Sequence, residues 1–171
     1  LLDSKTFSMF IDTPQYRRKV LDRCLMAADK NYIKDFFSFH KALKQRNAAL
    51  KQDSKYGLDV WSETFASSGS HLSKKREEFF QRTKKVFFNF SKYFSDKRVL
   101  DIINSLDIIF YKGWQEEYSL NKALQKSLDS DSRRQTTGAG PHKADIKFLS
   151  NGEDIKYILS RGEQKFLSIL W

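Results

Sequence analysis

The sequence predicts an α+β fold in which helices dominate. Of the 171 residues, 40% are hydrophobic and 30% are charged, with only 7 Gly and 2 Pro, which is typical of a globular, helix-rich chain. Apolar residues recur at three- and four-residue spacing over much of residues 13–94, the period of amphipathic helices. After Lys97 the spacing changes to alternation, the period of a strand. The length suits one domain, or slightly more, with a sizeable core.

Two helices are expected in the first third of the chain. Thr13 is a suitable N-cap, and Pro14 fits the first turn, where its missing N–H does no harm. The buried stripe of this helix is expected to contain Val20, Leu21, Cys24, Leu25 and Ala28. Asn31 is expected to cap a longer helix that ends at "DSKYGL". Its apolar face contains Ile33, Phe36, Phe37, His40, Leu43 and Leu50.

The segment 58–94 also has a helical pattern and is rich in aromatic residues. Its apolar positions are Trp61, Phe65, Leu72, Phe79, Phe80, Val86, Phe87, Phe90 and Tyr93. The stretch "SSGS" at 67–70 predicts a break or kink. Two long helices joined by a short polar link are expected to lie antiparallel as a helical hairpin. Aromatic side chains at this spacing could stack on bases, but they are far more often core.

The last part of the chain mixes strands and helices. Residues 106–111 alternate and predict a strand that ends at "KGW". A helix over "QEEYSLNKALQKSLDSD" and a loop over "SRRQTTGAGP" follow. The segment "HKADIKFLSNGEDIKYIL" predicts two strands around the turn "SNG". This small strand pair leads into a helix that begins at Ser160.

The charge of the chain points to a polyanionic partner. The formal net charge is +10 and the pI is about 9.6, which favours nucleic acid, since each neutralised phosphate releases counterions. An anionic membrane would attract the same charge, but the basic residues are spread over many segments and no apolar run is long enough to span a bilayer. Cys24 is the only cysteine, which indicates a reducing cytosol and excludes a multi-cysteine metal site. His40, His71 and His142 lack metal-site spacing.

Five basic clusters occur along the chain. They are residues 17–19, then Lys41, Lys44 and Arg46, then 74–76, then Arg82, Lys84 and Lys85, and finally Arg133 and Arg134. Any one cluster is more typical of a solvated helix face, but their sum favours DNA or RNA. The DNA-binding candidates are Arg17, Arg18, Lys74, Lys75, Arg76, Lys84, Lys85, His142 and Lys143. A basic nucleic-acid-binding helical module with no nucleotide role, and a pure interaction scaffold, are the alternatives.

The stretch "ILSRGEQKFL", residues 158–167, has two interpretations. Ser160 and Glu163 stand three residues apart before an apolar run, the pattern of a capping box. A helix start of this kind also offers free N–H groups, a hydroxyl and the positive end of a dipole, which suit a phosphate. Spacing alone allows both interpretations.

Five motifs in order resemble the RecF family of bacterial DNA replication and repair proteins. They are "TPQYRRKVLD", "KALKQRNAALK", "YKGW", "TGAGPHKADI" and "LSRGEQK". The resemblance implies an ABC/SMC-type ATPase head interrupted by a helical lid, with 1–23 and 132–171 in the head and 24–131 as the lid. The family's phosphate loop would precede Leu1, and its magnesium-binding acids would follow Trp171, so both ends are expected to be truncated. Near Asp12 and Thr13, "DSKTFSMFIDTPQ" departs from the glycines that relatives often have.

The resemblance also implies the role of "LSRGEQK" as the ABC signature motif. Its residues Ser160, Arg161, Gly162, Glu163, Gln164 and Lys165 would bind ATP in trans, held by the other subunit of a dimer. We expect Ser160 and Gly162 to contact the phosphate. Glu163 is assigned mainly to capping, because its carboxylate competes with a phosphate. Arg161 and Lys165 would add positive charge or an interface pairing.

The function that the resemblance implies is ATP-dependent DNA binding in recombinational repair, replication restart and the SOS response. An ATP-dependent homodimer, with magnesium, would bind gapped DNA in the nucleoid and help load RecA with RecR and, through it, RecO. The full-length protein would be a slow DNA-stimulated ATPase. No G-x-x-x-x-G-K-[ST] loop or pair of strand-end acids occurs in this chain, so by itself it is not expected to hydrolyse ATP.

Overall fold

A computed structural model describes residues 7, 10–52 and 57–171 of the chain. The chain divides into two compact units. Unit 1 comprises Leu1–Leu21, Glu78–Tyr111 and Asp145–Trp171, and unit 2 comprises Asp22–Glu77 and Lys112–Ala144. The division falls inside two helices, α2 (Pro14–Ala28) and α4 (Leu58–Phe90), so each of these helices contributes residues to both units. The expected assignment of 24–131 to a lid stays a prediction.

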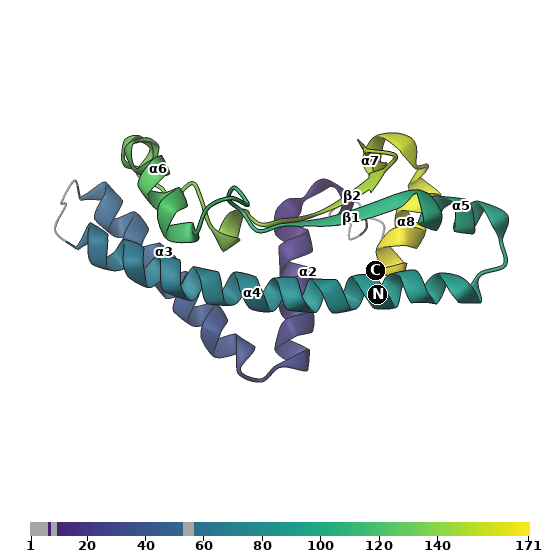
Figure 1. Cartoon of the computed structure of the whole chain (residues 1–171), viewed down its shortest axis with the longest axis horizontal. Helices are drawn as coiled ribbons and strands as arrows, with labels where there is room; N and C mark the ends of the chain where they lie inside the picture. Colours follow the sequence, from purple (N-terminus) through teal and green to yellow (C-terminus); the bar gives the residue numbers. More distant parts are fainter. Residues whose placement is uncertain (1–6, 8–9, 53–56) are drawn as a thin grey trace. The chain divides into compact units, whose positions relative to one another are not determined.

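Unit 2 is built on an antiparallel pair formed by α3 (Tyr32–Lys51) and the first part of α4 (Figure 1). Asp35 contacts Lys75 at 2.8 Å, the rings of Phe39 and Phe65 lie 5.3 Å apart, and Arg46 donates to the Ser62 hydroxyl at 3.0 Å. From one of these contacts to the next, the residue number rises in α3 and falls in α4, so the two helices run in opposite directions. The predicted helical hairpin is therefore confirmed. The link at 53–56 lies outside the described residues.

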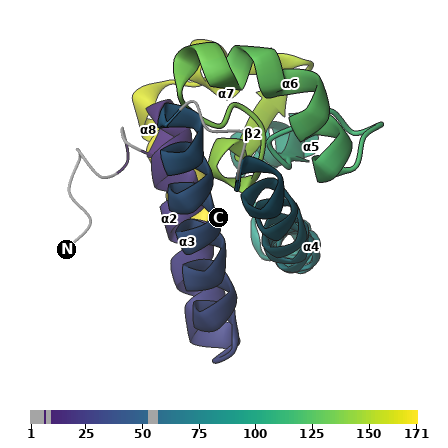
Figure 2. The same cartoon turned by 90° about the vertical axis from the view of Figure 1, so that its left-hand side faces the viewer.

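Helix α6 (Leu120–Arg134) lies over the α3–α4 pair in both views (Figure 1 and Figure 2). The helix was expected from Gln115 and begins five residues later, because Ser119 caps it by accepting from the Lys122 N–H at 3.2 Å. It also runs through Arg134, which the sequence placed in a loop. Gln135 ends it in the left-handed conformation, at φ 52°.

The predicted break at residues 67–70 is wrong, because α4 is continuous from Leu58 to Phe90. Ser68 donates to the Thr64 carbonyl at 2.8 Å, so its hydroxyl is satisfied within the helix. Gly69 has a packing role: a Cβ atom there would lie 2.7 Å from Leu120 Cδ2 and 3.3 Å from Pro141 Cδ. The glycine lets α6 and the loop before β2 approach the helix closely, and does not interrupt it.

The predicted buried faces of the first two helices are partly wrong. In α2, Cys24 and Ala28 are exposed, whereas Leu21, Asp22 and Leu25 are buried. In α3, Ile33, Phe37 and His40 are exposed. The buried positions of α3 are Tyr32, Phe39, Ala42, Arg46 and Leu50. The prediction counted only apolar residues, whereas the inner faces of these helices also contain buried charged residues, Asp22 in α2 and Arg46 in α3. Asn31 makes no side-chain capping bond.

Unit 1 contains a three-stranded antiparallel sheet in the order β1–β2–β3. The predicted strand over residues 106–111 is confirmed as β1 (Leu106–Tyr111), which pairs with β2 (Asp145–Ser150) from Leu106↔Ser150 to Tyr111↔Asp145. Asn151 and Gly152, at φ 51° and 87°, make the turn into β3 (Glu153–Asp154), as two-residue hairpin turns require.

Two segments next to this sheet differ from the prediction. The second strand of the expected pair ends at Asp154, whose carboxylate accepts from the Lys156 N–H at 2.9 Å and caps the one-turn helix α7 (Ile155–Ile158). Before β2, the residues Pro141–Lys143 form a 3-10 turn, η2, and not a strand.

An additional helix precedes the strand over residues 106–111 in the chain. Helix α5 (Lys97–Ser105) was not predicted, and it is capped by Asp96, which accepts from the Val99 N–H at 3.0 Å. A short 3-10 turn, η1 (Ser91–Tyr93), separates α4 from this segment. An aspartate before an amphipathic nine-residue segment is the signal that could have found the helix.

Aromatic side chains form the core of unit 1. Trp171, which follows α8 (Arg161–Leu170), lies 5.8 Å from the ring of Phe80, 5.7 Å from Phe87 and 5.3 Å from Phe148. Phe80 and Phe87 are buried on the last part of α4. These two members of the aromatic run from Phe79 are therefore core residues and not base-stacking groups.

Candidate nucleotide-binding surface

The segment "LSRGEQK" forms a capped helix start in unit 1. Helix α8 begins at Arg161, and Ser160 is its N-cap in extended conformation. The Ser160 hydroxyl accepts from the Glu163 N–H at 3.4 Å, and the Glu163 carboxylate accepts from the Ser160 N–H at 2.8 Å. The capping box is thus present. The N–H groups of Arg161 and Gly162 have no acceptor within the helix, because the first turn of any α-helix leaves its donors unpaired.

The N-terminus of α8 is open to solvent. Ser160, Arg161 and Gly162 are all exposed. A Cβ atom on Gly162 would meet nothing within 4 Å, so free space surrounds this glycine. The unpaired N–H groups, the hydroxyl of Ser160 and the positive end of the helix dipole therefore face a region that an anion can enter.

A cavity of about 620 Å³ adjoins this helix start. It is lined by Phe7, Ile11, Asp12, Lys156, Leu159, Ser160, Arg161, Gln164 and Lys165. Three of these side chains are cationic and one is anionic, so the lining carries a net positive charge that attracts anions. Asp12 pairs with Lys156 at 3.0 Å, and this hydrogen bond raises the pKa of the Lys156 ammonium.

The remaining signature residues have different surroundings. Gln164 donates to the carbonyls of Leu159 at 2.8 Å and Lys156 at 3.2 Å, so it braces the loop before the helix. The Lys165 ammonium lies 5.1 Å from the centre of the Phe7 ring, a cation–π contact. Neither contact was expected from the sequence.

The carboxylate of Glu163 has one polar and one cationic partner. The Ser160 hydroxyl lowers the pKa of Glu163 most from its ordinary value of 4.5, and the Arg98 guanidinium lowers it further. Arg98 Nε lies 2.6 Å from Glu163 Oε1 and comes from α5. The carboxylate therefore stays ionised at neutral pH, and a counter-charge accompanies it.

Two of the DNA-binding candidates are buried in ion pairs. Arg17 donates to both carboxylate oxygens of Asp145, at 2.8 and 2.9 Å. Arg76 donates to both oxygens of Asp22, at 2.8 Å each, and to the Pro141 carbonyl at 2.7 Å. These contacts engage the guanidinium groups inside the protein. Arg17 and Arg76 therefore hold the fold together and offer little charge to a phosphate.

The buried Asp22 also binds a tyrosine. The Tyr32 hydroxyl donates to Asp22, and burial raises the pKa of this phenol well above its ordinary value. The hydroxyl stays protonated and completes the set of donors around the carboxylate. Burial of a charge is tolerated here because each partner is satisfied.

The other DNA-binding candidates differ in whether their side chains contact other groups of the protein or are exposed. Lys75 contacts Asp29 and Asp35 at 2.8 Å each, and Lys84 donates to the Ile108 carbonyl at 2.6 Å. The His142 ring bonds the Thr137 carbonyl at 2.8 Å. Arg18 is half-buried, and Lys74, Lys85 and Lys143 are exposed.

Two of the motifs quoted for the family resemblance meet in unit 2. The Gly140 N–H donates to the Gly113 carbonyl at 3.1 Å, which joins "TGAGP" to "YKGW". Gly113 has φ 103°, and a Cβ there would lie 2.1 Å from the Gly140 carbonyl oxygen, so only glycine fits. Gly113 and Gly140 are therefore needed for the close backbone contact between the two motifs.

Arg46 anchors the same loop from α3. It donates to Asp131 at 2.9 Å and to Thr137 at 2.7 Å, with its side chain fully buried. Asp131 in turn accepts from the Gly138 N–H at 2.9 Å. Arg46 was predicted to belong to a basic cluster with Lys41 and Lys44. Its helical spacing from Ala42 and Leu50, which are buried, is the signal that could have separated it from those exposed lysines.

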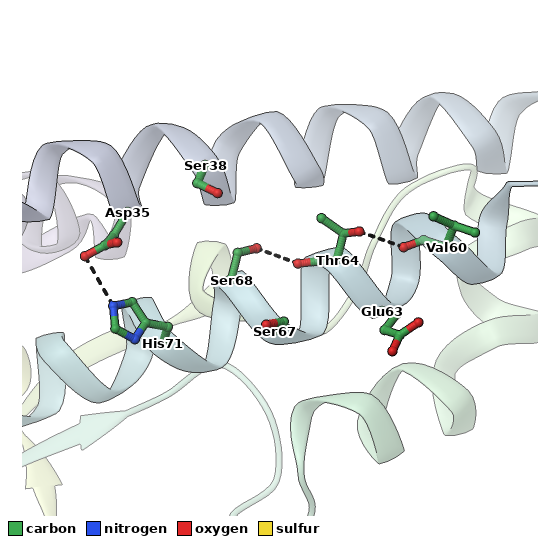
Figure 3. Close-up of a pocket in the computed structure, with 8 residues that line it drawn as sticks. All are labelled: Asp35, Ser38, Val60, Glu63, Thr64, Ser67, Ser68 and His71. Atoms are coloured by element: carbon green, nitrogen blue, oxygen red, sulfur yellow. Dashed lines mark hydrogen bonds and ion pairs between the residues drawn. The ribbon is translucent and has the colours of Figure 1, made fainter.

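A second cavity, of about 630 Å³, lies between α3 and α4 in unit 2 (Figure 3). It is lined by Asp35, Ser38, Val60, Glu63, Thr64, Ser67, Ser68 and His71. Thr64 and Ser68 turn their hydroxyls to carbonyls of their own helix, and His71 faces Asp35 at 3.3 Å (Figure 3). None of the predicted site residues lines it.

The described residues form neither a metal-ligand cluster nor a membrane-spanning helix. Within residues 7, 10–52 and 57–171, no group of three or more His, Cys, Asp or Glu side chains could hold a metal ion. Over the same ranges, no helix combines the length and apolar character that crossing a bilayer requires. Cys24 is a free, exposed thiol.

Curated proteins with related sequences are DNA replication and repair proteins. The chain is 36% identical to the RecF protein of Pseudoalteromonas translucida over 172 residues, which cover 98% of this chain and 45% of that protein. It is 32% identical to the RecF protein of Geotalea uraniireducens, with 92% and 44% covered. No family model matches the chain.

The fold is also that of solved RecF structures. The structure of the recombination mediator protein RecF-ATP in the RecFOR pathway matches with a TM-score of 0.84 and 27% identity, over 98% of this chain and 47% of that one. The corresponding RecF-ATPrS structure matches with a TM-score of 0.82. The α+β architecture, mostly helical with a small three-stranded antiparallel sheet, is therefore that of the RecF fold.

The chain belongs to the RecF family of DNA replication and repair proteins. It spans less than half the length of these relatives.

Proposed function

We propose that the full-length protein is an ATP-dependent DNA-binding protein of recombinational repair and replication restart, in which Ser160–Lys165 form half of a composite nucleotide site. Ser160 and Gly162 contact the γ-phosphate of an ATP held by the other subunit of a homodimer, and Arg161 and Lys165 add positive charge. The observation that carries the proposal is the exposed N-terminus of α8 beside a cavity lined by three cations.

The chemistry of this helix start suits a phosphate. It presents unpaired N–H groups, a hydroxyl and a dipole end, and the space around Gly162 lets an oxyanion approach the backbone. The family resemblance assigns the same residues to the ABC signature motif. ATP occurs in the solved RecF-ATP structure to which this chain is similar.

The rest of the ATPase would come from residues beyond this chain. A phosphate loop and magnesium-binding acids would hold ATP and magnesium, so that two subunits sandwich the nucleotide and clamp gapped DNA. Slow, DNA-stimulated hydrolysis would open the dimer. In this scheme the signature motif works in trans, and the helical segment over 24–131 acts as a lid on a head formed by 1–23 and 132–171.

The proposal is tested with Ser160→Arg in the full-length protein. A bulky cation at the N-cap blocks the approach of the phosphate from the other subunit, while ATP binding to the subunit's own phosphate loop is spared. We expect loss of DNA-stimulated ATP turnover and of ATP-dependent dimerisation, with ATP still bound. Turnover assays, sedimentation and fluorescent ATP binding measure these three quantities.

The matched control is Ser119→Arg. Ser119 is likewise an exposed N-cap serine, but it caps α6 in unit 2. Substitution removes a cap of the same kind, so both variants lose about 1 kcal/mol of stability or less. Unchanged turnover and dimerisation in Ser160→Arg would refute the nucleotide role and leave a basic DNA-binding module as the better function.

The DNA-binding part of the proposal rests on charge. Arg18, Lys74, Lys85 and Lys143 are its best candidates, since their side chains are not buried and the chain carries a net charge of +10. Affinity for gapped DNA should fall steeply as salt rises, because phosphate contacts release counterions. Negligible affinity even at low salt would indicate an interaction scaffold instead.

The partners follow from the family resemblance. The protein would bind RecR, and RecO through it, and help load RecA at gaps in the nucleoid, during recombination and the SOS response. One related structure is described as belonging to the RecFOR pathway. Co-sedimentation of the full-length protein with RecR, with and without ATP, tests this part separately from the nucleotide site.

A further inference from the structure

The pair formed by Arg98 and Glu163 stands at the entrance of the signature segment. Arg98 Nε lies 2.6 Å from Glu163 Oε1, while the other oxygen, Oε2, accepts from the Ser160 N–H at 2.8 Å. The carboxylate is thus fixed beside the backbone that the proposed phosphate would approach. The Glu163 side chain is 15% exposed and that of Arg98 is 78% exposed.

We propose that Arg98 is a positioning residue for the nucleotide site, which neutralises the Glu163 carboxylate so that a triphosphate can bind at the N-terminus of α8. The inference rests on the proposed nucleotide role of Ser160 and Gly162. It assigns a function to α5, an element outside every motif of the family resemblance.

Electrostatic repulsion from Glu163 opposes the binding of a phosphate at Ser160. The capping carboxylate bonds the Ser160 N–H directly, so a phosphate held by Ser160 lies within a few ångströms of a like charge. Two like charges this close repel each other, and near a protein surface the repulsion is stronger than in bulk water. A guanidinium in contact with the carboxylate removes most of this repulsion without breaking the capping box.

The position of Arg98 in its own helix is unfavourable for a cation. Arg98 lies in the first turn of α5, and that turn contains no acidic residue. A cation near the positive end of a helix is unfavourable, so α5 gains nothing locally from an arginine there. An exposed ion pair also adds little to stability. Arg98 is therefore better explained by its effect on the charge of Glu163 than by a contribution to the stability of α5.

Arg98 is the cation that neutralises the Glu163 carboxylate in the part of the chain that the structure describes. Among the ion pairs of residues 7, 10–52 and 57–171, Glu163 contacts Arg98 and no other cation. The cations Lys156, Arg161 and Lys165 line the cavity beside Ser160, and Lys156 pairs there with Asp12 at 3.0 Å.

The experiment measures ATP-dependent dimerisation of the full-length protein with four variants. They are Arg98→Ala, Arg98→Lys, Glu163→Gln and the double variant Arg98→Ala/Glu163→Gln. A glutamine at position 163 preserves the capping box and removes the charge. The readouts are the ATP concentration at half-maximal dimerisation, ATP binding to the monomer, and the thermal unfolding midpoint.

We expect Arg98→Ala to raise the half-maximal ATP concentration by about five- to tenfold, the effect of roughly 1 kcal/mol of unscreened repulsion. Arg98→Lys should recover most of the loss, since it restores the charge. The double variant should return to within about twofold of Glu163→Gln, because no carboxylate remains to be neutralised. Monomer ATP binding should stay unchanged throughout, and the unfolding midpoint should fall only slightly, as expected when an exposed ion pair is lost.

A double variant as weak as Arg98→Ala would overturn the inference, because Arg98 would then act as a tether between α5 and α8 or contact the nucleotide itself. An unaffected Arg98→Ala would overturn it as well. The Ser160→Arg variant separates these outcomes from failure of the nucleotide site: if Ser160→Arg dimerises normally with ATP, the site itself is wrong, and the Arg98 inference falls with it.

Discussion

Two arginine–carboxylate pairs, one in each unit, lie in opposite surroundings. In unit 2, Arg76 contacts Asp22 at 2.8 Å, and their side chains are 2% and 9% exposed. In unit 1, Arg98 contacts Glu163 at 2.6 Å, but the guanidinium is 78% exposed. The contact distances are similar, whereas the surroundings differ. Burial, and not the contact itself, decides whether such a pair holds the fold together or stays accessible to a ligand.

The difference has an energetic reason. A buried charge that loses its partner cannot be solvated by water, so its removal from a pair is costly. An exposed charge that loses its partner is solvated at once, and the loss is small. Buried pairs, among them Arg17–Asp145 in unit 1, therefore constrain the fold, while the exposed pair at the signature segment can exchange partners at little cost.

The largest expected effect comes from breaking the buried pair. Arg76→Met should lower the free energy of unfolding by about 3–5 kcal/mol, because Asp22 is left buried without its cation. Urea unfolding followed by circular dichroism measures the loss. The matched control Arg98→Met should lose no more than about 1 kcal/mol.

The double variant Arg76→Met/Asp22→Leu sharpens the same test. Removing both charges leaves no unpaired carboxylate, so much of the stability should return. Equal losses in Arg76→Met and Arg98→Met would contradict the comparison between the two units.

Two glycines offer the next test. Gly69→Ala should destabilise by about 1–2 kcal/mol, since the clash with Leu120 and Pro141 outweighs a gain of about 1 kcal/mol in helix propensity. Gly162→Ala, which has open space around it, should raise stability by up to about 1 kcal/mol. Thermal unfolding of both variants measures the sign. Losses of similar size in both would show that Gly162 is also a packing residue.

Glu163 predicts a smaller, pH-dependent effect. Its pKa is lowered in the folded state, mainly by the Ser160 hydroxyl, so its contribution to stability is full above the unfolded value of about 4.5 and is lost as the pH falls through the lower folded value. The stability difference between the parent and Glu163→Gln should therefore be constant at neutral pH and shrink below pH 4.5.

Denaturant titrations between neutral and acidic pH measure this difference, with the exposed Glu153→Gln as the control. A difference that does not change with pH would show that the charge of Glu163 is not what stabilises the helix start.

The smallest expected effect compares neighbouring lysines in unit 2. Lys74 is exposed, whereas the Lys75 ammonium is held by Asp29 and Asp35. If the basic face binds DNA as proposed, Lys74→Ala should reduce the slope of log affinity against log salt by about 1, and Lys75→Ala should change it less. Fluorescence anisotropy over a salt series measures both slopes, and a larger effect at Lys75 would contradict the assignment.

Local features of this protein could be predicted from the sequence. The capping box of Ser160 and Glu163, the strand over residues 106–111 and the turn at Asn151 and Gly152 are all present in the structure. Each depends on residues close together in the chain, whose hydrogen bonds and side-chain period are encoded in a few positions.

The functional meaning of the basic clusters could not be predicted in the same way. Arg17, Arg46 and Arg76 read as cationic surface, yet each is buried against an aspartate far away in the sequence. Spacing along one helix does not reveal a partner that another segment supplies. The candidate nucleotide residues, by contrast, form one continuous stretch, so a motif was enough to find them.

The sequence by itself determined the helical hairpin, the strand over residues 106–111 and the capped start of α8, because these depend on local periodicity and hydrogen bonding. Only the tertiary structure decided which charges are buried, why Gly69 sits inside a continuous helix, and that Arg98 meets Glu163. Those outcomes depend on contacts between distant segments, and burial changes the free energy of a charge far more than any local pattern does.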